Sequence, residues 1–296
     1  MHLTDQILLL HHELKSKIYK HGPYHAFKIN DPKPRDIHKA SVRDRLVHHA
    51  VYRILYPYFD KKFIYDSYSC RLDRGAHKAI GRFKNFAQTV SLNNTRTAWI
   101  LKGDIRKFFA SIDHDILQNI FKKYITDSDI LWLLDQLINS FHTKGKINVG
   151  LPLGNLTSQL FVNIYMNEFD QFVKRKLKVG CYIRYADDFV IFSNNKFYLE
   201  QLIQKLSEFL KNKLKLTLHP DKLFIKTLAS GVDFLGWIIF PHHLILRTST
   251  KKRMFKKLKK NHSIKSLASY TGILDHGNTH NLTRKIKTLY SDFFIN

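Results

Sequence analysis

The stretch CYIRYADDFVIFS, residues 181–193, places two adjacent aspartates, Asp187 and Asp188, in the middle of an apolar run. The flanking residues are Tyr, Phe, Ile and Val, which favour β-strands, so the stretch predicts a hairpin with the aspartates at its tip. Two neighbouring carboxylates repel each other and lose hydration when buried, unless a strong positive charge lies between them. Because aspartate is also common in turns, the pair by itself leaves a structural and a catalytic interpretation open.

A third aspartate favours the catalytic interpretation. The stretch TAWILKGDI, residues 97–105, predicts an apolar strand with Asp104 at its end. A strand-end carboxylate and a carboxylate pair at a hairpin tip together supply the oxygen ligands that hard divalent cations such as Mg²⁺ require. Two such ions, roughly 3.5–4 Å apart, stabilise both the attacking and the leaving oxygen of a phosphoryl transfer. The pattern therefore predicts a two-metal site built from Asp104, Asp187 and Asp188.

The charge of the chain indicates a polyanionic partner. Its 296 residues include 49 Lys and Arg against 24 Asp and Glu, a formal net charge of +25. A surplus of this size favours nucleic acid as the partner over an anionic membrane surface or a merely solvated surface. The hydrophobic fraction of 44% is ordinary for a folded protein, which at this length forms one large domain or two to three subdomains.

Several other classes of protein are disfavoured. Cys70 and Cys181 are the only cysteines, which leaves neither a disulfide framework nor a cysteine-based zinc site. Residues 1–17 predict an amphipathic helix and lack the features of a signal peptide. No stretch of 18 apolar residues predicts a membrane span, and the 17 histidines lack the spacing of an HExxH-type metal site. We therefore expect a cytoplasmic protein without a membrane partner.

The periodicity of the remaining chain predicts a mixed α/β (α+β) body followed by basic helices. Residues 24–39 predict two short strands around a turn at Asn30-Asp31-Pro32, and Ser41 is a candidate cap for a helix over 41–58. Residues 247–296, which begin RTSTKKRMFKKLKK, predict a small basic helical segment. The other expected elements are helices that begin near Ser111 or Asp113 and that span 155–177 and 196–213, with strands near 214–228 and 232–240.

Five stretches occur in the order of the successive sequence blocks of reverse transcriptases. They are WILKGDIRKFFASIDHDIL, GLPLGNLTSQLFVNIYMNEFD, YADDFVIF, LTLHPDKLFI and DFLGWII. Upstream, SVRDRLVHHAVYRILYPYFD resembles the group II intron-like bacterial members of that family. The resemblance implies a right-hand polymerase fold. Residues 24–240 would form fingers and palm, with helices packed on an antiparallel palm sheet, after an N-terminal helical segment, 1–23, and before a small helical thumb, 247–296.

The same resemblance implies an RNA-directed DNA polymerase. Its substrates would be a template RNA, a primer or cDNA strand and deoxynucleoside triphosphates, and its cofactors two Mg²⁺ ions, for which Mn²⁺ can substitute. From the short C-terminal segment we expect no RNase H, integrase, endonuclease or maturase domain. A catalytically idle RNA-binding protein on the same scaffold is the alternative from another class, although the three intact aspartates argue against it.

The block GLPLGNLTSQLFVNIYMNEFD narrows the resemblance to one group of reverse transcriptases. Most reverse transcriptases have QG at this point and SP after three further residues, whereas this chain has Leu153-Gly154-Asn155-Leu156-Thr157-Ser158-Gln159. An apolar residue before the glycine and the SQ ending are similar to the reverse transcriptases of diversity-generating retroelements. Those enzymes copy RNA with frequent errors opposite adenine and act with a small basic accessory protein. Another bacterial reverse transcriptase, of the antiphage-defence, retron or intron-derived type, remains the alternative.

The resemblance also implies roles at the metal and sugar sites. Asp104 and Asp187 would bridge both metal ions, with Asp188 as the third carboxylate and the carbonyl of Ile105 as a further ligand. Phe109 would lie beneath the sugar of the incoming nucleotide and exclude a 2′-hydroxyl, which selects deoxynucleotides. A position in the hydrophobic core is the alternative for this ring.

Four basic residues are candidates for the triphosphate. Lys28 and Arg35 flank the turn of the predicted hairpin at a spacing similar to that of a phosphate-binding lysine and arginine in retroviral enzymes. Arginine holds phosphate oxygens with two hydrogen bonds and lysine acts as a point charge. Arg71 and Arg74 are rival phosphate or template contacts.

The blocks GLPLGNLTSQLFVNIYMNEFD and LTLHPDKLFI contribute the remaining candidates. Gly154 would let the backbone approach the nascent base pair, and Gln159 would lie near the template. Leu153 replaces the glutamine that usually bonds the incoming sugar, so we expect a less strictly aligned nucleotide. Lys222 matches the lysine that donates a proton to the departing pyrophosphate, with an ordinary surface lysine as the alternative.

Overall fold

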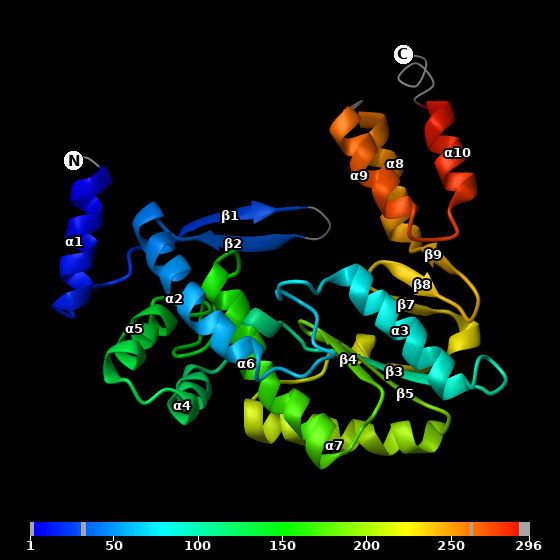
Figure 1. The fold of residues 1–296 in the computed structure, drawn as a ribbon, viewed down its shortest axis with the longest axis horizontal. Coiled ribbons are helices and arrows are strands. Elements are labelled where there is room, and N and C mark those ends of the chain that lie inside the picture. Colours follow the sequence, from blue (N-terminus) through cyan, green and yellow to red (C-terminus); the bar gives the residue numbers. More distant parts are fainter. Residues whose placement is uncertain (1–2, 31–33, 261–262, 290–296) are drawn as a thin grey trace. The chain divides into compact units, whose positions relative to one another are not determined.

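The computed structural model describes residues 3–30, 34–260 and 263–289. The chain divides into two compact units (Figure 1). Unit 1 comprises Met1–Gly75, Lys102–Val190 and Gln201–Leu223, and unit 2 comprises Ala76–Leu101, Ile191–Glu200 and Phe224–Asn296. The expected metal and nucleotide residues all fall in unit 1.

Unit 1 is built around a buried helix. Helix α6 (Leu156–Gln171) is buried on nearly every side, and α2 (Val42–Asp60) packs along it (Figure 1). The other helices of this unit are α1 (Leu3–Lys15), α4 (His114–Tyr124), α5 (Ser128–Asn139) and most of α7 (Lys196–Leu214). Ser41 caps α2 and Asp113 caps α4 by accepting hydrogen bonds from backbone N–H groups, which confirms both predicted helix starts.

The predicted basic hairpin is confirmed as a two-stranded antiparallel ribbon. Strand β1 (His25–Ile29) pairs with β2 (Arg35–Lys39), and Lys28 lies opposite Asp36. Asp31 and Pro32 of the expected turn lie outside the described residues.

The carboxylates belong to a sheet in which the strands follow the order β4–β5–β3. The strands are β3 (Trp99–Asp104), β4 (Tyr182–Tyr185) and β5 (Asp188–Ser193). Two residues connect β4 to β5, a connection that joins antiparallel neighbours. The hairpin predicted over 181–193 is thereby confirmed, with the aspartates at its tip.

Unit 2 combines a second small sheet with helices. Strands β7 (Val232–Phe234), β8 (Trp237–Ile239) and β9 (Leu244–Leu246) form an antiparallel meander. The other elements are α3 (Ala76–Ser91), β6 (Phe224–Thr227), α8 (Thr248–Lys260), α9 (Ile264–Leu274) and α10 (His280–Leu289). Met254 and Leu258 of α8 are buried whereas most of its lysines are exposed, as the apolar face of the predicted basic helix requires.

One predicted boundary is wrong. The expected strand near 214–228 is limited to β6, because Pro220 begins a 3₁₀ turn through Lys222 and proline has no N–H to donate to a strand ladder. The helix predicted over 155–177 is confirmed, since α6 continues directly into a π-helical turn, Phe172–Lys176.

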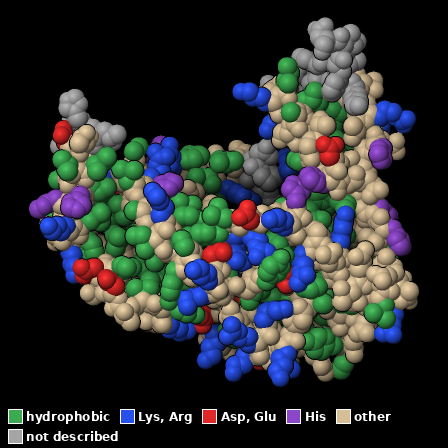
Figure 2. Space-filling model, viewed as in Figure 1, with side chains coloured by type: hydrophobic (Ala, Val, Ile, Leu, Met, Phe, Trp, Pro, Cys, Tyr) green, Lys and Arg blue, Asp and Glu red, His purple; other side chains and the backbone are tan. Residues whose placement is uncertain are grey.

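Lys and Arg side chains cover much more of the visible surface than Asp and Glu do (Figure 2). Among the described residues, no helix combines the length and the apolar composition that a membrane crossing needs.

Candidate active site

The backbone brings the end of β3 to the turn between β4 and β5. Ala186 occupies the left-handed region with φ +55°, and Asp187 completes the two-residue connection. The N–H of Ile105 donates to the carbonyl oxygen of Asp187 at 3.2 Å. Asp104, which precedes Ile105, therefore lies beside the aspartate pair.

Gly103 and Phe189 decide which way the carboxylates point. A Cβ atom on Gly103 would lie 2.3 Å from the ring of Phe189, so only glycine fits beneath that ring. Phe189 in turn packs edge-to-face on Phe169 of α6, with 5.4 Å between ring centroids. Since side chains alternate along a strand, Asp104 and Asp188 point to the opposite face of the sheet, away from α6.

Two lysines lie against these carboxylates. The Nζ atom of Lys222 is 2.6 Å from Oδ2 of Asp104 and donates a hydrogen bond to it. The Nζ atom of Lys102 is 3.6 Å from Oδ1 of Asp188, and Lys102 is only 7% exposed. A buried ammonium so close to a carboxylate lowers the cost of burying either charge. The structure thus brings four of the predicted residues together, Asp104, Asp187, Asp188 and Lys222, and adds Lys102.

The aspartates carry more negative charge than the lysines offset. Burial and, to a smaller extent, the charges of Asp104 and Asp188 together raise the pKa of Asp187 to about 6, against the smaller effect of Lys222. Burial also raises the pKa of Asp188, together with the neighbouring Asp104, whereas Lys102 and Lys222 lower it. A cation placed among the three carboxylates would relieve the repulsion that opposes their ionisation.

Phe109 lies in a 3₁₀ turn, Phe108–Ser111, that directly follows β3. Phe108 is buried, while Phe109 is half-buried and packs edge-to-face on it at 5.6 Å. The carbonyl oxygen of Phe109 accepts a hydrogen bond from the N–H of Leu151 at 2.8 Å. This bond ties the turn of Phe109 to the segment that leads into Leu153.

The turn at 153–155 is fastened to β2. The carbonyl oxygen of Leu153 accepts a hydrogen bond from the N–H of His38. Gly154 has φ +110°, and a Cβ atom there would lie 2.7 Å from Ile37. The side chain of Asn155 donates to the carbonyl oxygen of His38 at 2.7 Å and accepts from the N–H of Ala40 at 3.2 Å.

Asn155 was not a predicted site residue, and in the structure it occupies the cap position before α6. Its side chain makes no such cap bond and instead holds the hairpin strand next to Leu153. Gln159 lies half-buried in the first turn of α6, where its N–H bonds to the carbonyl oxygen of Asn155.

The candidate phosphate residues are not brought together. Lys28 lies opposite Asp36 and Arg35 opposite Ile29 in the β1–β2 register. Because cross-strand partners share a face and successive residues alternate, Lys28 and Arg35 leave opposite faces of the ribbon. This register does not fit the expectation that the side chains of Lys28 and Arg35 bind the same triphosphate.

The side chain of Arg71 is buried and hydrogen-bonded within the protein. Its guanidinium donates to the side chain and carbonyl of Asp60 and to the carbonyls of Ile64 and Ser67, and only 4% of the side chain is exposed. These bonds make it a poor phosphate contact, contrary to the expectation. Arg74 stacks over Tyr65, with 4.1 Å from its guanidinium carbon to the ring centroid.

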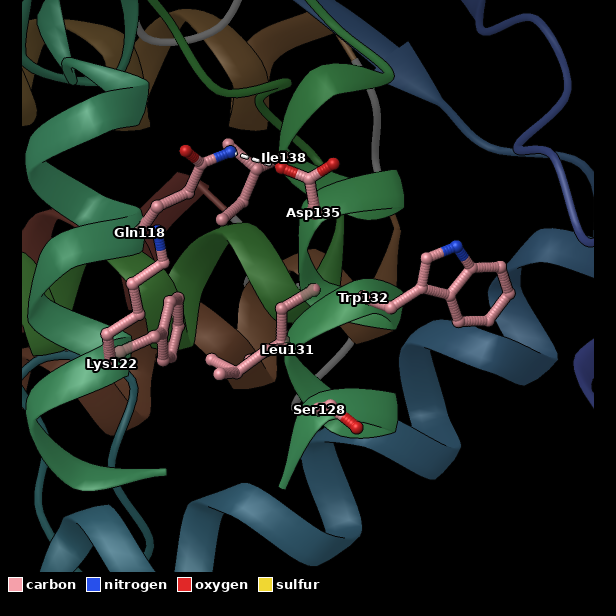
Figure 3. A pocket seen from close by; sticks show the side chains of 9 residues that line it. Gln118, Lys122, Ser128, Leu131, Trp132, Asp135 and Ile138 are labelled. Atoms are coloured by element: carbon pink, nitrogen blue, oxygen red, sulfur yellow. Dashed lines mark hydrogen bonds between the residues drawn. The ribbon is translucent and has the colours of Figure 1, made fainter. Parts of the chain in front are cut away.

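A separate pocket lies between α4 and α5 (Figure 3). Leu131 and Ile138 contribute apolar lining, and a hydrogen bond joins Gln118 to Asp135 at the rim. None of the predicted site residues lines this pocket.

The sequence model of the reverse transcriptase (RNA-dependent DNA polymerase) family matches residues 20–239. The chain belongs to this family. Reverse transcriptase relatives include the group II intron-encoded protein LtrA of Lactococcus lactis subsp. cremoris, which is 25% identical over 299 residues that cover 79% of this chain and 48% of LtrA. Protein YkfC of Escherichia coli is 28% identical over 287 residues that cover 83% of this chain and 73% of YkfC.

Solved telomerase structures share the fold. Telomerase from Candida albicans, in a complex with a fragment of telomeric RNA, has a TM-score of 0.61 at 12% identity and covers 92% of this chain. This chain covers 55% of that telomerase chain. The predicted fold class, a right-hand α+β polymerase, is confirmed, and family membership confirms the predicted enzyme class, RNA-directed DNA polymerase.

Reverse transcriptases generally use divalent metal ions, and the carboxylates fit such ions by their chemistry. Burial and mutual repulsion raise the pKa of two of the three, which a divalent cation would counteract. Within the described ranges, no three His, Cys, Asp or Glu side chains already form a compact ligand cluster. The ammonium of Lys222 lies on Oδ2 of Asp104, where it would compete with a metal ion for that oxygen.

Proposed function

We propose that this chain copies an RNA template into DNA with two Mg²⁺ ions held by Asp104, Asp187 and Asp188. The observation that carries the proposal is that Asp104 and Asp188 lie on one face of the sheet and that their charges, together with burial, raise the pKa of the neighbouring Asp187 to about 6. Neutral side chains would fold more easily at these positions, so a function that needs the charge is the simplest reason for their presence.

Nucleotide addition forms a bond between the primer 3′-oxygen, which gives up its proton to water, and the α-phosphorus of a deoxynucleoside triphosphate, and it breaks the bond to pyrophosphate. Bound Mg²⁺ ions would supply charge stabilisation for the attacking and leaving oxygens. Asp104 and Asp187 would hold the ions, with the Ile105 carbonyl as a candidate further ligand. Lys222 carries a proton on Nζ and, once displaced from Asp104, donates it to the departing pyrophosphate. Phe109, one turn beyond Asp104, closes the space that a 2′-hydroxyl would need.

The proposal includes a diversity-generating type of reverse transcriptase that works with a small basic accessory protein. Its support is the turn at Leu153 and the SQ ending at Gln159. The apolar side chain of Leu153 can donate no hydrogen bond to the incoming sugar, and its carbonyl oxygen accepts a hydrogen bond from the N–H of His38. An incoming nucleotide is then aligned mainly by pairing, stacking and the metal ions, which favours errors.

We also propose that residues 247–296 act as a basic thumb on the template–primer duplex. Lysines of α8 are exposed while Met254 and Leu258 anchor the helix. Phosphate neutralisation by such lysines provides affinity that is independent of sequence and falls with salt.

Primer extension on a defined RNA template tests the activity. We expect extension with dNTPs and Mg²⁺ by the wild-type chain, and none by Asp104→Asn or Asp187→Asn, while RNA affinity stays near the wild-type value in all three proteins. RNA binding without any extension by the wild type, with and without candidate accessory proteins, would favour the idle RNA-binding alternative. Extension by either variant at the wild-type rate would contradict the metal assignment.

A further inference from the structure

A buried ion pair lies directly beneath the catalytic turn. Arg184, in β4, and Asp170, near the end of α6, are both 0% exposed, and Arg184 is the largest fully buried side chain in the described part of the chain. The Nη2 atom of Arg184 is 2.7 Å from Oδ2 of Asp170, and Nε donates to both carboxylate oxygens. Tyr182 donates a further bond to Asp170 at 2.7 Å.

The rest of the guanidinium reaches the turn itself. Nη1 donates to the carbonyl oxygen of Ala186 at 3.0 Å and to the side chain of Asn163 at 3.2 Å. Nη2 also donates to the hydroxyl of Ser67 at 3.0 Å. Ala186 is the residue in the left-handed conformation, with φ +55°, and its carbonyl group forms the peptide bond to Asp187. One planar side chain therefore joins α6, the segment at Ser67 and the backbone that carries the catalytic aspartate.

Stability alone is a weak reason for this arrangement. Burying two charges costs solvation, and well-packed apolar residues of similar volume are often as stabilising as a buried ion pair. A non-glycine residue in the left-handed region also carries conformational strain, so the turn needs a partner that holds it. Arg184 supplies that partner with a rigid fork that lysine cannot reproduce.

We propose that Arg184 is a positioning residue for the reverse transcriptase reaction, which it supports by fixing the Ala186–Asp187 peptide so that the Asp187 carboxylate is preorganised for metal binding. The proposal rests on the proposed two-metal function. It assigns to Arg184 no contact with substrate, metal or nucleic acid. Asp170 serves as the anchor that orients the guanidinium.

Three substitutions separate positioning from core packing. Arg184→Lys keeps a positive charge beside Asp170 but cannot also reach Ala186, Asn163 and Ser67. Tyr182→Phe and Ser67→Ala are the matched controls, because each removes one hydrogen bond from the same network and leaves the bond to Ala186 intact. Where Arg184→Lys does not fold, Asp170→Asn replaces it, since it loosens the anchor without changing side-chain volume.

The readout independent of activity is Mn²⁺ binding to the full chain without RNA or nucleotide, followed by the loss of the free-ion signal in electron paramagnetic resonance. We expect Arg184→Lys to weaken Mn²⁺ binding about tenfold, the scale of one lost hydrogen bond from a charged donor, and both controls to bind as the wild type does. In primer extension we expect kcat to fall while KM for dNTP and template stays unchanged. Circular dichroism and Tm confirm that the compared proteins are folded.

Equal Mn²⁺ affinity and kcat in Arg184→Lys and the two controls would overturn the proposal and make Arg184 a core residue only. An equal loss in all three variants would overturn it as well, because the bond to Ala186 would then have no special part. A wild-type chain that binds Mn²⁺ but extends no primer contradicts the proposed function, while the Mn²⁺ comparison still decides the role of Arg184. A wild type that binds no Mn²⁺ overturns both.

Discussion

Replacing Asp187 by asparagine should abolish polymerisation and yet stabilise the metal-free protein at neutral pH. The two effects have one cause. Burial and the charges of Asp104 and Asp188 raise the pKa of Asp187 to about 6, so its ionised form is disfavoured in the folded state. Asparagine has nearly the same shape and no charge, and it relieves the repulsion while it removes a metal ligand.

The sign and the size follow from proton linkage. Between the ordinary value near 3.8 and the raised value near 6, the folded protein holds a proton on Asp187 that the unfolded chain has lost, so the free energy of unfolding falls as the pH rises through this window. Above the window the loss of stability that the ionised Asp187 causes is constant. At 1.36 kcal/mol per pKa unit, this loss is at most about 3 kcal/mol. Partial exposure to solvent screens the charges, and about 1–2 kcal/mol is the figure we expect to measure. The difference in the free energy of unfolding between Asp187→Asn and the wild type should therefore be largest above pH 6 and vanish near pH 4.

Urea unfolding of both proteins at several pH values, with a chelator present, measures the difference. Asp104→Asn is the matched control. It also removes a proposed metal ligand, but it breaks the 2.6 Å ion pair with Lys222 and should bring no gain in stability. With Mg²⁺ added at pH 7.5, the wild type should gain stability by ligand linkage and Asp187→Asn should not. Parallel stability curves for the wild type and Asp187→Asn between pH 4 and pH 7.5 would refute the reasoning.

Three other variants test the remaining parts of the site. Phe109→Val should raise kcat/KM for a ribonucleotide relative to its deoxynucleotide, because the space denied to the 2′-hydroxyl opens; an unchanged ratio would remove Phe109 from the sugar site. Leu153→Gln should reduce misincorporation opposite template adenine, as counted by sequencing cDNA from one adenine-rich RNA, and identical error spectra would shift attention to Gln159 or an accessory protein. Neutralising four lysines of α8 should flatten the salt dependence of template–primer binding, whose slope is about −0.9 per neutralised phosphate on B-DNA, and an unaltered slope would assign this helix another partner. The four are Lys251, Lys252, Lys256 and Lys257.

Local patterns sufficed for most of the fold. The alternation and β-branched content of 181–193 and 97–105 specify strands, and Ser41 and Asp113 are caps whose side-chain oxygens take the first free N–H groups of their helices. Patterns of this kind act within a few residues and are visible in one sequence. The prediction of a strand over 214–228 is wrong because its apolar residues favour a strand while Pro220 interrupts the hydrogen bonds between strands.

Contacts between distant segments could not be predicted in the same way. Lys28 and Arg35 have a suitable spacing in sequence, but the register of the ribbon decides the face, and a shift of one residue reverses it. Lys102 lies two residues before Asp104, and the sequence alone assigned it no role. In the structure Gly103 lies beneath the ring of Phe189 on one face of the sheet. Because side chains alternate along the strand, that of Lys102 lies on the other face, beside Asp188.

The residues that support the site therefore differ in kind from those that were recognisable. A carboxylate at a strand end or in a hairpin tip can be recognised in the sequence because nothing else in the local pattern explains it. Gly103, Arg184 and Asn155 are compatible with ordinary local roles, as a strand glycine, a strand arginine and a helix cap. Each becomes significant through one partner that the local sequence pattern does not reveal: the Phe189 ring, the Ala186 carbonyl and the His38 backbone, respectively. Because those partners fix where the catalytic backbone lies, substitutions at these three positions should alter metal or nucleotide alignment even though none of the side chains is proposed to touch substrate.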